Sequence, residues 1–125
     1  MRLAGAAKWL RIYVSERAQW QGRPLYAAIV DLLRREGIAG ATVHRGIAGY
    51  GPSGLLRTAR IVQLSVDLPV VIEVIDTAER IAQVLPSVDE MLGEGLVILT
   101  DCEVVAYRAR RHDHDGDEPG GVEHG

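Results

Sequence analysis

Apolar and polar side chains alternate along residues 8–14. One side of this stretch carries only aliphatic residues, whereas the other carries two aromatic rings and a guanidinium: Leu10, Ile12 and Val14 against Trp9, Arg11 and Tyr13. A period of two is typical of a β-strand with one buried face. We therefore predict a strand here whose second face carries bulky side chains.

The next apolar positions follow a helical period. They recur at positions i, i+4, i+7 and i+8, which are Leu25, Ile29, Leu32 and Leu33. Pro24 fits a first helical turn, whose N–H groups have no acceptor inside the helix, and Gly37 can end the helix. The pattern predicts an amphipathic helix between Pro24 and Gly37.

Three strand-like stretches come next, at residues 41–47, 59–65 and 70–75. The first two flank a glycine-rich loop and predict a β-arm. A bend at Asp67-Leu68-Pro69 separates the second from the third, because proline lacks the N–H group that a strand ladder needs.

A second helical period covers residues 81–92. We expect Asp76 and Glu79 to open this helix as a capping box. Pro86 permits either one kinked helix or two short helices. The last strand region follows at residues 96–99 and 103–107, with a break near Thr100-Asp101.

The predicted order of elements is β, α, β, β, α, β. This is the ferredoxin-like plan, an α+β fold in which an antiparallel sheet carries two helices on one face. We assign this domain to residues 8–108, after a flexible leader at residues 1–7. Residues 109–125 are acidic, contain histidine and lack apolar periodicity, so we expect a disordered tail.

Composition excludes several classes of protein. The net charge is −3, and the three excess acids fall in the tail, so the domain itself is neutral. Aromatic residues make up only 5% of the chain, which argues against a nucleic-acid binder. No apolar run approaches the roughly 18 residues that cross a bilayer, and no secretory signal is evident. We expect a cytoplasmic protein without membrane insertion, in which the single cysteine, Cys102, is a small core residue.

The loop at residues 44–60 combines glycines, a proline and basic side chains. Its peptide N–H groups, with Arg45, Arg57 and Arg60, are able to face an anion. The loop matches neither the P-loop nor the dinucleotide fingerprint. A plain hairpin loop has the same composition, and both interpretations stay open.

We predict no catalytic residue and no metal site. No nucleophile stands beside a base, and no acid pair is evident. His44 is interpreted as a strand surface residue, because the sequence shows no carboxylate to orient it. The tail offers nitrogen and oxygen ligands without a folded frame to hold them, at His112, Asp113, His114 and Asp115.

Several segments together resemble a known family. They are KWLRIYVSE, GRPLYAAIVDLLRREGIAGATVHRGIAGYG, LSVDLPVVIEVID, LPSVDEML and GEGLVILTDCEVVAYR. They are similar, in this order and over about residues 8–108, to the bacterial and archaeal proteins of domain of unknown function 190. That family is PII-like, and the segment IAGATVHRGIAGYG is the most specific part of the match.

The resemblance implies a compact homotrimer that binds an adenine nucleotide in clefts between subunits. By motif, residues 49–51 correspond to the root of the long PII loop, and residues 93–95 to the small loop before the last core strand. The nucleotide-binding residues implied are Arg45, Gly49, Tyr50, Gly51, Gly93, Glu94, Gly95 and Arg108. A loop that meets a partner protein, a transporter or an enzyme, is implied at Pro52, Ser53, Gly54 and Arg57.

The chain departs from the PII pattern at three basic positions. Pro52, Leu96 and Ala106 stand where PII proteins have phosphate-binding cations. Because each charge-assisted hydrogen bond is worth about 1.5–3 kcal/mol, we expect AMP or ADP in preference to ATP.

Each of three residues with an implied nucleotide contact also has a purely structural interpretation. Tyr50 either stacks on a base or fills a subunit interface, and Arg108 either meets a phosphate or pairs with an acid at the sheet edge. Glu94 is a solvated loop acid or a ribose contact. We expect a PII-like signalling protein without enzymatic activity. The alternatives are a metal-tolerance protein of the CutA type, which shares the fold, and an enzyme acting on a small phosphorylated compound.

Overall fold

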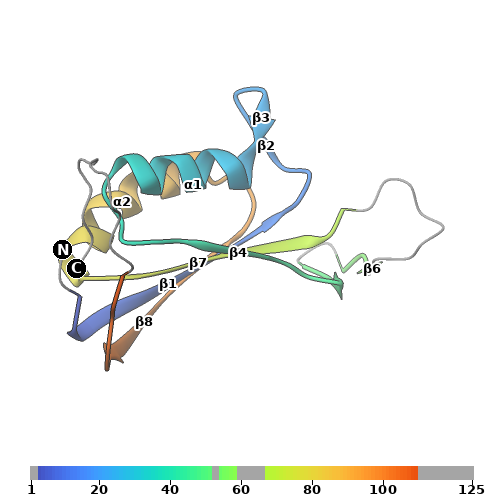
Figure 1. Ribbon diagram of the computed structural model, residues 1–125. Helices are drawn as coiled ribbons and strands as arrows, with labels where there is room; N and C mark the ends of the chain where they lie inside the picture. The colour runs from blue at the N-terminus through green and yellow to red at the C-terminus, as the bar shows by residue number, and fades with distance from the viewer. Residues whose placement is uncertain (1–2, 52–53, 59–66, 110–125) are drawn as a thin grey trace.

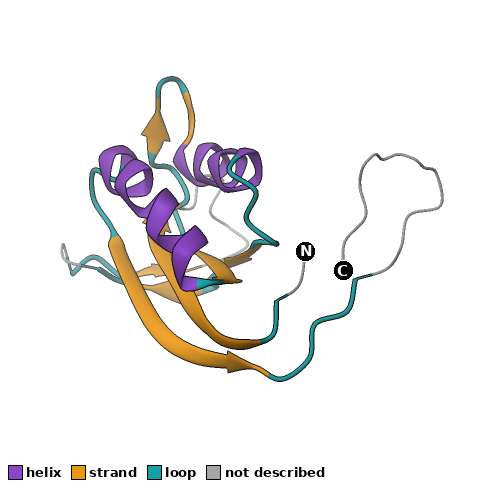
Figure 2. Ribbon diagram, turned by 90° about the vertical axis from the view of Figure 1, so that its left-hand side faces the viewer, coloured by secondary structure: helices purple, strands orange, loops and turns teal. Residues whose placement is uncertain are grey.

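The computed structural model describes residues 3–51, 54–58 and 67–109. Its centre is a four-stranded antiparallel sheet in the order β4-β7-β1-β8. These strands are β1 (Gly5–Ser15), β4 (Thr42–Arg45), β7 (Pro69–Asp76) and β8 (Leu96–Val104). Two helices, α1 (Leu25–Arg35) and α2 (Ala78–Met91), lie side by side on one face of the sheet (Figures 1 and 2). The predicted ferredoxin-like arrangement is confirmed.

The core lies between the sheet and the helices. Alternate residues of β1 and β7 are fully or almost fully buried there, including Leu10, Ile12, Ile72 and Val74. The helices contribute the apolar stripe that their period predicted, at Leu25, Ile29, Leu33, Ile81, Val84 and Val88. Burial of each such side chain contributes about 1.5–3 kcal/mol, which makes this face the main source of stability.

The second face of the sheet has no helix over it in the described structure (Figure 2). Trp9, Arg11 and Tyr13 lie on this face, as the alternation in β1 predicted. The Arg11 guanidinium is 4.5 Å from the Trp9 ring centroid, within the range of a cation–π contact. Its Nη1 donates to the Tyr13 hydroxyl at 3.3 Å.

Strand β1 begins at Gly5, so residues 5–7 belong to the sheet and not to the expected leader. Leu3 and Ala7 are also buried. At the other end of the chain, the expected tail lies outside the described residues except for Ala109. Within the described residues, neither helix has the length and apolarity needed to cross a bilayer.

A short hairpin that the pattern analysis did not predict precedes α1. It consists of β2 (Gln19–Trp20) and β3 (Arg23–Pro24), joined through Gln21 and Gly22, both with positive φ. The Leu25 N–H donates to the carbonyl of Ala18 at 2.8 Å, which closes the hairpin at the start of the helix. In Figure 1 the hairpin rises from the helix layer.

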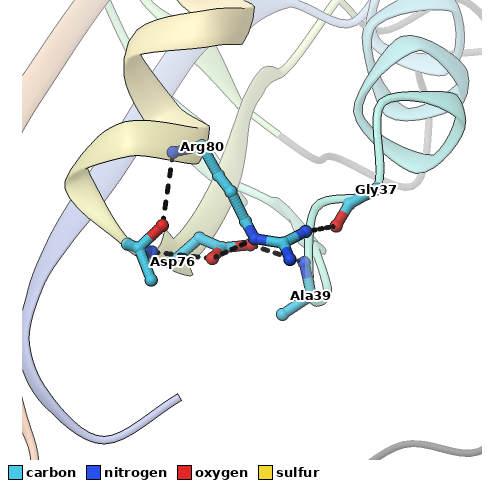
Figure 3. A network of polar contacts seen from close by, with 5 residues as sticks. Gly37, Ala39, Asp76 and Arg80 are labelled. Atoms are coloured by element: carbon cyan, nitrogen blue, oxygen red, sulfur yellow. Dashed lines mark hydrogen bonds and ion pairs between the residues drawn. The ribbon is translucent and has the colours of Figure 1, made fainter. Parts of the chain in front are cut away.

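The start of α2 differs from the expected capping box. Thr77 is the N-cap, and its hydroxyl accepts from the Arg80 N–H at 3.2 Å. Asp76 is fully buried and accepts from the N–H groups of Ala39 and Thr77, each at 2.7 Å (Figure 3). The prediction was wrong because Asp76 continues the inward-facing alternation of β7. The helix runs unbroken across Pro86, which decides between the two alternatives.

The last strand is also continuous, so the expected break near Thr100-Asp101 was wrong. Each of these residues has a partner on β1: Thr100 lies opposite Trp9, and Asp101 lies opposite Lys8. The Lys8 ammonium forms an ion pair with the Asp101 carboxylate across the two strands. This cross-strand pair compensates for the low strand propensity of aspartate.

Candidate functional site

The arm projects from one end of the sheet, beyond β4 (Figure 1). It contains two short paired strands, β5 (Ala48–Gly49) and β6 (Arg57–Thr58). At its base the Gly46 N–H donates to the carbonyl of Pro69 at 2.7 Å. The arm is therefore attached to the bend before β7. Residues 59–65, the predicted return strand, lie outside the described residues.

Close packing explains two glycines of the arm. A Cβ on Gly46 would lie 2.8 Å from Pro69 Cγ, and a Cβ on Gly49 would lie 3.2 Å from the same atom. Gly51 and Gly54 have open space around them. Gly54 adopts a φ of +76° and donates to the Gly51 carbonyl at 2.8 Å, so it belongs to a turn. Gly46 and Gly49 thus serve the attachment of the arm.

Acids of the same chain hold the two described arginines of the arm, whereas Arg60 lies outside the described residues. Arg45 Nε is 3.0 Å from Glu16 Oε2, and Arg57 Nη1 is 3.1 Å from Asp67 Oδ2. Asp67 also accepts from the Ser15 hydroxyl and, at 3.2 Å, from the Arg17 N–H. An anion that binds Arg45 or Arg57 in this conformation has to compete with these carboxylates.

The described part of the arm exposes large apolar side chains. Tyr50 is 74% exposed, and Ile47 is 78% exposed. Leu55 and Leu56 are also exposed, whereas Pro52 and Ser53 lie outside the described residues. Such exposed apolar groups on a projecting element are suited to contact with another protein surface.

The loop at residues 93–95 lies at the same end of the sheet as the arm base. Leu96, which follows the loop, pairs with Tyr13 near the end of β1, and Ser15 pairs with Pro69. A Cβ on Gly95 would lie 2.6 Å from the Tyr13 carbonyl oxygen, so this glycine allows the loop to pass close to β1. Gly93 has open space around it, and Glu94 is exposed.

Arg108 lies toward the other end of the sheet. Strand β8 pairs with Tyr13 at its start and with Gly5 at Val104, so eight residues, or about 26 Å, separate its two ends. Arg108 is only four residues beyond Val104, a reach of at most about 14 Å. The side chain is exposed and has no ion pair within the described residues. One chain therefore does not bring Arg108 together with the arm.

Comparison with known proteins places this geometry in a family. Residues 7–104 match DUF190, described as Uncharacterized ACR, COG1993. The chain belongs to this family. A UPF0166 protein of Methanocaldococcus jannaschii is 48% identical over 99 residues, which cover 78% of this chain and 91% of the relative. A UPF0166 protein of Aquifex aeolicus is 41% identical over 100 residues, which cover 78% of this chain and 92% of the relative.

The fold of this DUF190 chain is similar to that of CPII, a nitrogen regulatory PII-like protein from Thiomonas intermedia K12. One CPII structure, bound to ADP, AMP and bicarbonate, has a TM-score of 0.57 and 20% identity, covering 82% of this chain and 97% of CPII. A second, with the same ligands, has a TM-score of 0.59 and 21% identity, covering 83% and 99%. These likenesses confirm the PII-like fold.

The structure reveals polar residues that sequence reasoning missed in the DUF190 chain. Glu16 pairs with Arg45 and Asp67 with Arg57, and only tertiary structure brings these partners together. His44 has a carboxylate partner after all, since its Nε2 is 3.1 Å from Glu73 Oε1 on the neighbouring strand. Cross-strand pairing was the signal that could have located Glu73.

The described residues hold no group of three or more histidine, cysteine, aspartate or glutamate side chains that is suited to a metal ion. Cys102 is a free thiol and only half-buried, so the expectation of a core cysteine was wrong. The His44–Glu73 pair is exposed on the sheet face. No observation on these residues favours the metal-tolerance alternative or the enzyme alternative.

Proposed function

We propose that this DUF190 protein is a PII-like signalling protein that assembles as a homotrimer and binds AMP or ADP in clefts between its copies. The observation that carries the proposal is the separation of the candidate residues within one chain. Arg45, residues 49–51 and residues 93–95 gather at one end of the sheet, and Arg108 extends from the other. In the proposed ring, each head-to-tail interface joins two different surfaces of neighbouring copies and brings the Arg108 end of one sheet to the arm end of the next.

The ligand class rests on two further points. The CPII structures of similar fold hold ADP and AMP. In this chain, Leu96 and Ala106 are exposed and uncharged. The proposed cleft therefore has fewer cations for a triphosphate than the PII pattern provides at these positions. Since each charge-assisted hydrogen bond contributes about 1.5–3 kcal/mol, a monophosphate or diphosphate suits the remaining arginines better.

The arm is proposed to report the ligand to a partner. Its exposed apolar side chains, Ile47, Tyr50, Leu55 and Leu56, lie within or beside the segment of residues 50–58. Nucleotide bound at the arm base orders this segment for contact with a cytoplasmic partner, a transporter or an enzyme. Ordering of a loop by a ligand is a common form of molecular switch.

Replacement of Arg108 tests the nucleotide cleft. We expect Arg108→Gln to weaken AMP or ADP binding about tenfold to a hundredfold, because one charge-assisted contact to phosphate is lost. The measurement is isothermal titration calorimetry of the full chain with AMP, ADP and ATP in separate runs. Arg34→Gln, an exposed arginine of α1, is the matched control and should leave affinity unchanged. Sedimentation of the unliganded protein should give three times the chain mass of 13.6 kDa.

Two results of that experiment would reject the proposal. The first is the absence of heat with all three nucleotides at millimolar concentration. The second is a monomeric protein that binds nucleotide with unchanged affinity after Arg108→Gln. In the second case the residues at the arm end form the site alone.

Replacement of Glu16 tests whether its carboxylate competes with phosphate for Arg45. Glu16→Gln removes the ion pair, in which the side chains are 27% and 56% exposed. Because such pairs are worth about 0–1 kcal/mol, we expect AMP to bind up to about fivefold more tightly. Glu79→Gln makes the same charge change in the first turn of α2, outside the residues proposed for the cleft, and is the control. If AMP affinity, measured by the same titration, rose equally in both variants, the gain would come from the lower negative charge of the protein and not from release of Arg45.

A further inference from the structure

A second candidate binding site lies in the helix layer, away from the arm. A cavity of about 200 Å³ opens between the two helices and the β2–β3 hairpin. Trp20 lines it from the hairpin, Leu32 and Arg35 from α1, and Ser87, Glu90 and Met91 from α2. Figure 2 shows the hairpin standing at the helix layer, on the side opposite the uncovered sheet face.

The inner wall of this cavity is apolar. Leu32 and Met91 are buried at 8% and 9% exposure, and Trp20 packs against the core while remaining partly accessible. Small-molecule sites are commonly apolar pockets of about 300–1,000 Å³ with a few polar groups that orient the ligand. A cavity below this range suits a ligand smaller than a nucleotide.

The two opposite charges that line the cavity are separate. Arg35 comes from α1 and Glu90 from α2, and they form no ion pair with each other. Within residues 3–51, 54–58 and 67–109, neither side chain has another hydrogen bond or ion pair. Both side chains are exposed and line the same cavity, so a ligand that carries both complementary charges can meet each of them.

A third charged residue of the cavity already has a partner. Arg23 lines the cavity and forms an ion pair with Asp31 of α1. The hydrogen bond from Arg23 is the main cause that lowers the pKa of Asp31; desolvation opposes it, and the charges of Arg23, Arg35 and Arg34 lower the pKa further. Arg23 is thus paired with Asp31, and Arg35 is the cavity cation that forms no ion pair within the described residues.

We propose that this cavity binds a small zwitterion, an α-amino acid with an apolar side chain. Arg35 receives the carboxylate, Glu90 receives the ammonium group, and the side chain packs against Trp20 and Met91. Guanidinium and carboxylate groups form charge-assisted hydrogen bonds of the strong class. The site is distinct from the nucleotide cleft, and the proposal does not depend on it.

Titration of the full ¹⁵N-labelled chain with L-leucine and L-methionine tests this site by NMR. At millimolar ligand we expect saturable shifts at residues that line the cavity, with none at residues 46–51. L-Leucinamide, which lacks the carboxylate, and N-acetyl-L-leucine, which lacks the ammonium group, should each bind about tenfold more weakly or worse. If either derivative binds as tightly as leucine, or neither amino acid produces cavity shifts, the proposal is wrong.

Neighbouring residues supply matched variants. Arg35→Gln and Glu90→Gln should each reduce affinity for L-leucine about tenfold or more. Arg34→Gln and Asp89→Asn change the same charges at adjacent exposed positions that do not line the cavity, and should leave affinity unchanged. Equal losses in the cavity variants and their neighbours would overturn the assignment. Because all four positions lie on helix surfaces, unchanged circular dichroism should confirm that the variants fold.

Discussion

Asp76→Asn should lower the free energy of unfolding by about 2–3 kcal/mol, although the two side chains have nearly the same size. The Asp76 carboxylate is fully buried, and each of its oxygens accepts a backbone N–H, from Ala39 and from Thr77 (Figure 3). An amide has one oxygen, so one of these N–H groups would face an NH₂ group. An unsatisfied buried donor costs about 1–3 kcal/mol.

The same network connects three elements. Arg80 of α2 donates to the carbonyl of Gly37 at 2.8 Å, and its Nε is 3.7 Å from Asp76 Oδ1. Gly37 and Ala39 belong to the connection between α1 and β4, whereas Asp76 ends β7. Asp76→Ala removes both acceptors and should cost more than the asparagine variant, about 3–5 kcal/mol.

Urea unfolding at one fixed protein concentration measures both effects, since association changes apparent stability. The control is Asp89→Asn, which makes the same chemical change at an exposed position of α2 and should cost less than about 0.5 kcal/mol. A midpoint for Asp76→Asn equal to that of the control would show that the carboxylate does not hold the α1–β4 connection.

The sequence was informative where one face of an element is buried. Period-two and helical patterns predicted β1, α1 and α2, because burial against a common core repeats along each of these elements. Asp76 was misassigned although its alternation with Ile72 and Val74 points inward, because a carboxylate before a helix also fits a cap. At this position the alternation of the strand was a better guide than the capping motif.

The candidate site was less predictable, for two physical reasons. The pairs of Arg45 with Glu16 and of Arg57 with Asp67 join residues that are distant in the sequence, so only the folded chain brings them together. The second reason is that a glycine-rich sequence fits several structural roles, including anion binding, turns and close packing. Gly46 and Gly49 suggested an anion-binding loop, yet the close contact is with the Pro69 ring, which excludes a Cβ at Gly46 and leaves little space for one at Gly49. The two-residue strands of the β2–β3 hairpin are too short to show a period.

Gly95 offers the last test, because it separates the packing role of a glycine from its conformational freedom. Neither Gly95 nor Gly93 adopts a positive φ, so alanine fits the backbone conformation at both positions. A Cβ on Gly95 would lie 2.6 Å from the Tyr13 carbonyl oxygen and 3.0 Å from Leu92 Cδ1, whereas a Cβ on Gly93 meets nothing within 4 Å. Two neighbouring glycines of one loop therefore predict opposite results.

Gly95→Ala should destabilise the protein by about 1–3 kcal/mol, since β1 is held between β7 and β8 and the loop has to move instead. Gly93→Ala should stabilise it by about 0.4–1 kcal/mol, because alanine restricts the unfolded chain. Urea midpoints show whether each variant is more or less stable than the original protein. Titration with AMP shows whether a shift of the loop at residues 93–95 changes nucleotide affinity. If residues 93–95 contact the nucleotide, Gly95→Ala also weakens binding as the loop shifts from β1. Loss of stability with unchanged AMP affinity would assign the loop to packing alone and leave the cleft to the arm and Arg108.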